Sequence, residues 1–289
     1  MANIGIFDSG SGGLSVYREI RRLLPSEKYV YFADNAFCPY GSKSQAFICE
    51  RAREITELLV RRGADIIVVA CNTATAAAIA SLRAEFSEGT SEDLKEWSDG
   101  RLDRICFIGM EPAVKPAALG TRSGVIGVLA TAGTLAASKY LNTKGLYEDD
   151  VRIAEHVGQG FVELVERGEL SGPRAEAVVR ESLEPLLEEG ADTIVLGCTH
   201  YPFLLDTLRK VADDFCRANG KDPVRFIDPA PAVARQLLKV MDREGIAHGP
   251  VSPDSLASPD SGMAAAAGTG LTLLSSGPSC TLRDTARLL

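Results

Sequence analysis

An internal repeat is the feature of this chain that most restricts its fold. Residues 63–71 read GADIIVVAC and residues 190–198 read GADTIVLGC, at an offset of 127. A second, weaker match pairs IGIFDS at 4–9 with IGVLAT at 126–131, at an offset of 122 and in the same order. Each longer copy has the pattern of a helix end, a Gly-Ala-Asp turn, a buried strand and a cysteine. The chain is therefore predicted to contain two similar halves.

Short apolar runs alternate with helical stretches along the chain, which indicates parallel α/β sheets. The expected strands cover residues 4–7, 29–32, 66–70, 105–108, 125–129, 193–196, 224–227 and 271–274. The expected helices cover residues 14–24, 45–62, 73–86, 161–167, 174–188, 203–218, 232–243 and 281–289. The fold class that follows is α/β: two similar open, mostly parallel-sheet domains related by a pseudo-two-fold axis, with the active site in the cleft between them.

The same pattern predicts where the two domains begin and end. We expect the first α/β domain to be discontinuous, built from residues 1–97 plus 210–289, and the second to comprise residues 98–209. The stretch 85–104 is charged and poor in apolar residues, so we expect a surface insertion. The stretch 249–270 is rich in Ser, Pro, Ala and Gly without a period, which predicts a surface loop.

Composition excludes several classes of protein. The 289 residues include 39 Asp+Glu against 31 Lys+Arg, a formal net charge of −8, which argues against a nucleic-acid partner. No apolar run reaches the ~20 residues of a membrane span, so no membrane partner is expected. The first residues lack a signal-peptide pattern, which predicts a cytoplasmic protein. Seven cysteines without a C-x-x-C pair indicate free thiols rather than a disulfide framework or zinc ribbon.

Cys71 and Cys198 end the two repeated strands, and ligands of open α/β sheets bind at this carboxyl end. A lone cysteine is more often a small buried hydrophobe, but two repeat-related cysteines, each followed by a polar pair, favour chemistry. If the two carboxyl edges face each other, the thiols approach one molecule from opposite sides, which suits racemisation or epimerisation. A thiol has an ordinary pKa of about 8.5, so one can be thiolate while the other stays protonated. Ser9 and Thr131 are predicted to be equivalent hydroxyls.

Polar residues next to the two cysteines are candidates for substrate binding. Asn72 and Thr73 open a helix, whose N-terminus attracts carboxylates and favours thiolate at Cys71. Thr199 and His200 are the analogous pair; His200 fits an acid/base partner, although a structural histidine is the ordinary alternative.

Three further positions are weaker candidates. Asp8 suits a substrate ammonium or proton removal at Cys71, and a tight turn between strand and helix is the alternative. Tyr40 and Gly41 lie in a turn whose amides can bind a carboxylate. Spacing alone gives Glu166 no role beyond an exposed helix charge.

These residues together form blocks that resemble those of glutamate racemases. The blocks are Asp8-Ser9-Gly10-x-Gly12-Gly13-Leu14, Pro39-Tyr40-Gly41-x-Lys43-Ser44, Ala70-Cys71-Asn72-Thr73-Ala74 and Gly197-Cys198-Thr199-His200-Tyr201-Pro202. They come in the family's order at similar spacings, and the resemblance runs from Ile4 to about Asp228, then more weakly to the C-terminus.

The resemblance implies a cofactor-independent enzyme, without metal, that interconverts L- and D-glutamate and supplies D-glutamate for peptidoglycan. It implies that Cys71 deprotonates D-glutamate and Cys198 deprotonates L-glutamate, with Asp8 and His200 assisting their respective thiols. It also implies a homodimer of two α/β domains. The substrate-binding residues that follow are Asp8, Ser9, Tyr40, Gly41, Asn72, Thr73, Thr131, Glu166, Thr199 and His200.

The sequence departs from the family pattern at three points. Val157-Gly158 stands where the family often has Cys-Pro ahead of the helix that carries Glu166. Cys38 precedes Pro39 where an apolar residue is common, which adds a thiol sensitive to oxidation. The stretches 85–104 and 249–270 look longer than usual.

Three other functions remain open at this stage. One is a racemase for another amino acid such as aspartate, because one methylene changes specificity by only about 1–3 kcal/mol. Another is a zinc enzyme that uses Cys71, Cys198 and His200 as ligands, although Cys-x-His is not a usual zinc spacing. The third is a two-lobed binding protein without chemistry.

Overall fold

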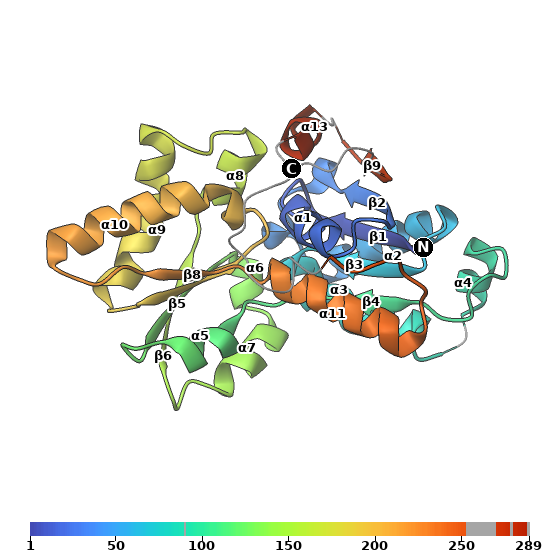
Figure 1. Ribbon diagram of the computed structural model, residues 1–289, viewed down its shortest axis with the longest axis horizontal. Coiled ribbons are helices and arrows are strands. Elements are labelled where there is room, and N and C mark those ends of the chain that lie inside the picture. Colours follow the sequence, from blue (N-terminus) through green and yellow to red (C-terminus); the bar gives the residue numbers. More distant parts are fainter. Residues whose placement is uncertain (90, 253–269, 278–279, 288–289) are drawn as a thin grey trace. The chain divides into compact units, whose positions relative to one another are not determined.

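The chain folds into two compact α/β units in the computed structural model, which describes residues 1–89, 91–252, 270–277 and 280–287. The first unit comprises Met1–Met110 and Ala230–Leu289, and the second comprises Glu111–Pro229. Both sheets are parallel throughout their described pairings, as the expected α/β class requires. Figure 1 labels most of the α-helices and strands of both units.

The first unit is built on a five-stranded sheet in the order β4-β3-β1-β2-β9. Its strands are β1 (Asn3–Asp8), β2 (Lys28–Ala33), β3 (Ile66–Val69), β4 (Cys106–Ile108) and β9 (Leu271–Ser275). Its helices are α1 (Leu14–Leu23), α2 (Gln45–Arg61), α3 (Asn72–Phe86), α4 (Glu92–Trp97), α11 (Ala230–Glu244) and α13 (Cys280–Arg287), with short 3-10 helices η1 (Asn35–Phe37) and η2 (Tyr40–Ser42).

The second unit is built on a four-stranded sheet in the order β6-β5-β7-β8. Its strands are β5 (Val125–Ala130), β6 (Arg152–Val157), β7 (Thr193–Gly197) and β8 (Arg225–Ile227). Its helices are α5 (Val114–Gly120), α6 (Ala132–Leu135), α7 (Ser138–Gly145), α8 (Phe161–Glu166), α9 (Pro173–Glu188) and α10 (Leu205–Asn219), with the 3-10 helix η3 (Tyr201–Leu204).

The two sheets share one topology, which supports the duplication predicted from the repeat. In each, the first strand lies between the second and the third, and the fourth pairs with the third. β9 is an addition to the first sheet. It pairs with β2, with Tyr29 opposite Leu271, while α11 packs on α1. The C-terminal segment therefore returns to the first unit, as the red and orange elements beside β2 and α1 show (Figure 1).

Equivalent residues make equivalent packing contacts in the two units. A Cβ placed on Gly5 of β1 would lie 3.3 Å from Leu59, and one on Gly127 of β5 would lie 3.1 Å from Leu186. Leu59 and Leu186 are themselves 127 residues apart, the offset of the repeat. Because Gly5 and Gly127 have no side chain, the helix that precedes the third strand of each sheet, α2 or α9, can approach the sheet closely.

The boundaries between the units fall at different residues from those expected. Contacts divide the chain after Met110 and after Pro229, whereas the sequence pattern placed the divisions at 97/98 and 209/210. The physical reason is strand pairing. β4 pairs with β3 and so belongs to the first sheet, and β8 pairs with β7 and so belongs to the second.

The stretch 85–104 is only partly the surface insertion that its composition predicts. It forms α4, capped by the Ser91 hydroxyl, which accepts the Leu94 N–H at 3.3 Å. Leu94 is fully buried and Trp97 is 6% exposed, against the Phe86 ring at a centroid distance of 5.3 Å. The expectation was therefore wrong for these two apolar side chains, which extend the core of the first unit.

Several elements of the second unit were not anticipated. β6 and the short helices α5, α6 and α7 lie in stretches of chain without a clear period. Most of the predicted 249–270 loop, residues 253–269, lies outside the described residues. Within the described part of the chain, no helix is both long and apolar enough to span a membrane.

Asp192, in the second copy of the repeated turn, ties the entry of β5 to the entry of β7. Its carboxylate accepts the N–H groups of Arg122 (2.7 Å) and Ser123 (2.8 Å) and the Thr121 hydroxyl (2.7 Å). Partial burial alone raises the pKa of this carboxyl, but the hydrogen bonds outweigh it and hold the pKa below its ordinary value.

We predict a pH-dependent loss of stability in Asp192→Asn. A lowered folded-state pKa stabilises the protein above the unfolded pKa of about 3.9, and this contribution disappears as the pH falls through the folded pKa. Urea unfolding should show the variant less stable than the parent at pH 7, with a difference that shrinks below about pH 4. Asp222→Asn, at an exposed side chain with one 3.5 Å ion pair to Arg122, is the control. A difference that does not change with pH contradicts the assignment.

Candidate functional site

The two repeated cysteines occupy equivalent positions at the carboxyl edges of their sheets. Cys71 follows β3 and is 5% exposed, and Cys198 follows β7 and is 8% exposed. Each strand pairs in parallel with the central strand of its unit. The residues that leave the central strand therefore emerge beside the cysteine at the same edge.

Cys71 caps the N-terminus of α3 and contacts a serine from the neighbouring strand end. Its Sγ accepts the Ala74 N–H at 3.4 Å and lies 3.8 Å from the Ser9 hydroxyl, to which it donates as a thiol. Unpaired N–H groups at a helix N-terminus stabilise negative charge. The position therefore favours the thiolate, the form of cysteine that acts as a base.

Asp8 is fully buried behind this thiol. Its carboxylate accepts the Gly13 N–H at 2.7 Å and the Ser9 hydroxyl at 3.4 Å. A Cβ on Gly13 would lie 2.7 Å from both the Asp8 Cβ and the Tyr31 hydroxyl, so only glycine fits this turn. The two interpretations of Asp8 are thus compatible: it closes the turn before α1, and it connects through Ser9 to Cys71.

Asn72 and Thr73 begin α3 directly after the thiol, and both are buried, at 4% and 7% exposure. Neither polar atom of the Asn72 side-chain amide has a hydrogen-bond partner among the described residues. A buried polar group left without a partner costs about 1–3 kcal/mol. A buried amide with a free donor and a free acceptor at a helix N-terminus is the arrangement expected of a ligand-binding residue.

Tyr40 and Gly41 form η2, which packs against α3. The Tyr40 hydroxyl is buried and donates to the Asp34 carboxylate. Burial raises the Tyr40 pKa, and the neighbouring Asp34 and Cys71 raise it further. The Tyr40 hydroxyl is therefore neutral, and its hydrogen is donated to Asp34. The backbone amides of the turn are the donors that could bind a ligand.

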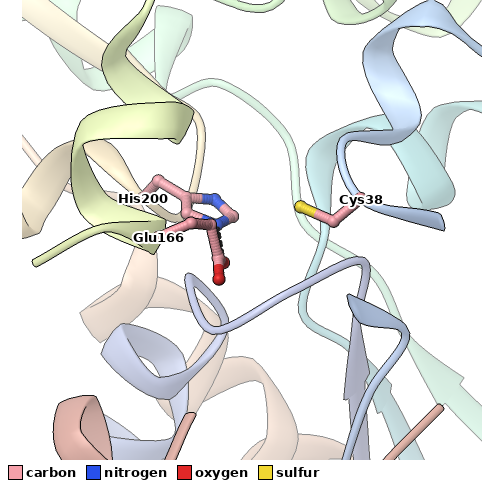
Figure 2. Close-up of side chains that lie close together, drawn as sticks. All are labelled: Cys38, Glu166 and His200. Atoms are coloured by element: carbon pink, nitrogen blue, oxygen red, sulfur yellow. Dashed lines mark hydrogen bonds and ion pairs between the residues drawn. The ribbon is translucent and has the colours of Figure 1, made fainter. Parts of the chain in front are cut away.

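Cys198 is connected to an imidazole and then to a carboxylate. Its Sγ lies 3.7 Å from Nδ1 of His200, and Nε2 of His200 lies 2.8 Å from Oε1 of Glu166 at the end of α8. Figure 2 shows the Glu166 carboxylate against the His200 ring. His200 is only 2% exposed. The thiol, the imidazole and the carboxylate thus form one chain of contacts within the second unit.

The hydrogen bond to Glu166 determines which nitrogen of the His200 ring carries the hydrogen. An ionised carboxylate can only accept, so Nε2 carries the hydrogen toward Glu166. In the neutral ring Nδ1 is then the acceptor, and it faces Sγ of Cys198. Glu166, to which spacing along the sequence assigned no role, thus fixes the orientation of the His200 ring through this hydrogen bond.

Two further predicted residues lie at the same edge of the second sheet as Cys198: Thr199 and Thr131. Thr199 follows Cys198 and is 3% exposed. Thr131 follows β5 as Ser9 follows β1, and its hydroxyl caps α6 by accepting the Thr134 N–H at 3.3 Å. The two half-sites are not chemically identical: Ala130 stands where the first unit has Asp8, and His200 stands where it has Thr73.

Tyr201 and Gly158 form a contact that sequence reasoning missed. The Tyr201 ring is fully buried, edge-on to Phe161 at 4.9 Å, and its hydroxyl donates to the Gly158 carbonyl at 3.3 Å. A Cβ on Gly158 would lie 2.6 Å from Cζ of Tyr201. The absence of a side chain at Gly158 therefore makes room for the Tyr201 ring.

Two further residues of the first half-site, Asp34 and Arg51, were also missed. The carboxylate of Asp34 is buried and receives a two-pronged hydrogen bond from Arg51 on α2. The available signal was an acidic residue close to the end of a predicted strand: Asp34 directly follows β2, whereas Asp8 is the last residue of β1 and pairs with Ala33. The six cysteines whose side chains are described, Cys71 and Cys198 included, are thiols rather than disulfide-bonded.

Comparison with known proteins gives one consistent result. The Asp/Glu/Hydantoin racemase family matches residues 4–237. The chain is 46% identical to a glutamate racemase of Ectopseudomonas mendocina, over 83% of this chain and 82% of that protein. It is 44% identical to a glutamate racemase of Methylococcus capsulatus, over 94% and 91% of the two chains.

Two solved structures that align with nearly the whole chain are also glutamate racemases. A Bacillus anthracis glutamate racemase, isoform RacE1, aligns with a TM-score of 0.76 at 27% identity, over 99% of this chain and 93% of that one. An Escherichia coli glutamate racemase in complex with L-glutamate and the activator UDP-MurNAc-ala aligns with a TM-score of 0.69 at 30% identity, over 99% and 92%. The two-unit α/β fold is that of these amino-acid racemases. This chain belongs to the Asp/Glu/hydantoin racemase family.

We predict that Gly158→Ala destabilises the second unit. The added methyl group collides with the buried Tyr201 ring, and overpacking of this kind costs about 1–3 kcal/mol. Urea unfolding measures the loss. Gly145→Ala is the matched control, because an added Cβ at the end of α7 meets no atom within 4 Å and alanine favours helix. Equal stability of the two variants contradicts the steric account.

Proposed function

We propose that this chain is a cofactor-independent glutamate racemase that works by a two-base mechanism. The observation that carries the proposal is the equivalence of Cys71 and Cys198. Both follow the third strand of a duplicated sheet, and each contacts polar or ionisable groups of its own unit. Curated relatives at 44–46% identity that are named glutamate racemase support glutamate as the substrate.

In the proposed reaction the two half-sites close on one glutamate, and the thiols act on opposite faces of Cα. The Cys71 thiolate removes the α-proton of D-glutamate, so a C–H bond breaks and an S–H bond forms. The Cys198 thiol then donates its proton to the opposite face of the carbanion, which gives L-glutamate and a Cys198 thiolate. The reverse reaction begins at Cys198, and the net proton transfer takes place between the two thiols and Cα.

The flanking groups fit assistance to each thiol. Ser9 links Cys71 to the buried Asp8 carboxylate. His200 presents Nδ1 to Cys198, with Glu166 behind it on Nε2. We infer that Asp8 and His200 assist proton transfer at their thiols, and that Glu166 acts through His200 as a positioning residue.

The substrate-binding groups follow from the polar atoms left at the two carboxyl edges. The Asn72 amide has a donor for a carboxylate and an acceptor for an ammonium, and both are without a partner among the described residues. An amino acid offers both of those groups. We place Asn72 in the substrate site, together with Asp8, Ser9, Tyr40, Gly41, Thr73, Thr131, Thr199 and His200.

The cellular setting is also a proposal. We infer that the D-glutamate serves peptidoglycan synthesis and that the enzyme acts in the cytoplasm as a homodimer. The thiols of the described cysteines fit a reducing compartment. Size-exclusion chromatography with light scattering tests the dimer.

The direct test of the activity is incubation with L-glutamate in D2O, followed by ¹H NMR. We expect loss of the α-proton signal and formation of D-glutamate, unaffected by EDTA. If the α-proton does not exchange and no D-glutamate forms, the proposal is overturned. Faster turnover of aspartate under the same conditions would reassign the substrate, and activity that depends on stoichiometric zinc would support the metal alternative.

We predict that Cys71→Ser and Cys198→Ser each abolish racemisation, because a serine hydroxyl is far too weak an acid to replace a thiol. Each variant should retain slow α-proton exchange from a single enantiomer: D-glutamate when Cys71 is intact, and L-glutamate when Cys198 is intact. Cys49→Ser, at a half-buried thiol on α2, should keep the parent activity. Full racemisation by either site variant is inconsistent with two bases.

We predict that Glu166→Gln lowers kcat at least about tenfold, since a glutamine that donates to Nε2 turns a proton on Nδ1 toward the thiol. Glu163→Gln is the matched control, because Glu163 is exposed on the same helix one turn earlier. Steady-state racemisation followed by polarimetry gives kcat in both directions. Equal kcat for the two variants would remove Glu166 from the mechanism.

A further inference from the structure

We propose that Arg51 and Asp34 are positioning residues that hold the Tyr40–Gly41 turn against the Cys71 half-site and thereby set the affinity for substrate. The inference rests on the proposed racemase function and adds two residues to it. Neither residue lies in the sequence blocks that identify the site, and their role follows from the hydrogen-bond network around the turn.

Asp34 is the centre of this network. It directly follows β2, its side chain is fully buried, and its N–H donates to the Asp8 carbonyl at 2.9 Å. The carboxylate accepts Arg51 Nε at 2.9 Å on Oδ2 and Arg51 Nη2 at 2.8 Å on Oδ1. The Tyr40 hydroxyl donates to Oδ2 as well. Asp34 thus connects helix α2, the η2 turn and the strand end that carries Asp8.

The turn depends on these side chains because it has little regular structure of its own. Residues 40–42 form a single 3-10 turn closed by the Lys43 N–H on the Tyr40 carbonyl at 2.9 Å. Around it, the Arg51 guanidinium lies 4.6 Å above the Phe37 ring, which meets Phe47 edge-on at 5.3 Å. Arg51 therefore holds the turn at two places, through Asp34 and through Phe37.

Besides holding the turn in place, Arg51 compensates the negative charge of the buried Asp34 carboxylate. A buried carboxylate is costly unless it is paired, and the bidentate arginine meets that requirement. The hydrogen bond to Asp34 raises the Arg51 pKa, so the guanidinium stays protonated. The Tyr40 ring lies in the same core cluster as Cys71, and its pKa is raised first by burial and then by Asp34 and the Cys71 thiolate. Arg51 keeps this buried negative charge compensated close to the catalytic thiol.

A positioning role predicts an effect on KM rather than on the chemical step. If the turn donates backbone amides to the substrate, a shift of the turn weakens ground-state and transition-state binding together. Because the two enantiomers have equal free energy, kcat/KM must fall by the same factor in both directions.

The experiment compares Arg51→Lys, Tyr40→Phe and the double variant with the parent enzyme, in racemisation assays over a range of glutamate concentrations. Arg51→Lys keeps the positive charge beside Asp34 but cannot form the bidentate hydrogen bond to its carboxylate, and Tyr40→Phe removes only the hydroxyl. Arg53→Gln is the matched control. Arg53 lies on the same helix and pairs with Glu85 and Asp93 over the Trp97 ring, away from the turn. Thermal unfolding is measured for every variant.

We expect Arg51→Lys and Tyr40→Phe each to raise KM about tenfold with kcat changed less than about threefold, the size of one lost hydrogen bond to a charged group. The double variant should raise KM by less than the product of the single effects, since both act through Asp34. Arg53→Gln should lower the unfolding temperature and leave KM unchanged. Arg51→Lys with parent KM and only a lower unfolding temperature would overturn the inference. An inactive parent enzyme would instead overturn the proposed function, and the inference with it.

Discussion

Parallel pairing of the central strand with the third strand is the constraint on which each half-site depends. In the first unit Phe7 lies opposite Val69, and in the second Ala130 lies opposite Gly197. Because the strands run in the same direction, the chain leaves both at one edge, so Asp8 and Ser9 emerge beside Cys71. A one-residue slip in either register would turn each strand's side chains to the other face and separate the polar residues from the thiol.

The duplication lets one set of packing rules build two different acid/base environments. The glycine in each central strand, the positive-φ glycine before the repeated Asp and the cysteine after the strand are all duplicated. The groups that tune the thiols are not. Cys71 caps a helix of fifteen residues and is connected to a buried carboxylate through Ser9, whereas Cys198 contacts an imidazole held by Glu166. In the two-base mechanism that we propose, one thiol is protonated while the other is not, and the different neighbours of Cys71 and Cys198 suit that difference.

Most strands and helices, and the equivalent positions of the two cysteines, were predictable from the sequence because buried parallel strands and repeats leave strong patterns. Strands such as 66–70 and the helices after them were placed within a residue or two, and Cys71 and Cys198 were identified from the repeat. The domain boundaries were not placed as well, because β4 and β8 are three-residue strands whose membership depends on pairing. Leu94 and Trp97 were assigned to the surface because their neighbours are charged, although α4 turns one apolar face inward. Asp34 with Arg51, and Gly158 with Tyr201, are seventeen and forty-three residues apart, so only the fold brings them together.

In the proposed mechanism, two thiols from different units of the fold act on one Cα. A crystal structure of the enzyme bound to D-glutamate tests it most directly, through the distance from each Sγ to the substrate Cα. The account predicts that Sγ of Cys71 and Sγ of Cys198 both lie within about 3.5 Å of Cα, on opposite faces. A complex in which only one sulfur reaches Cα, or in which both lie on the same face, would contradict it.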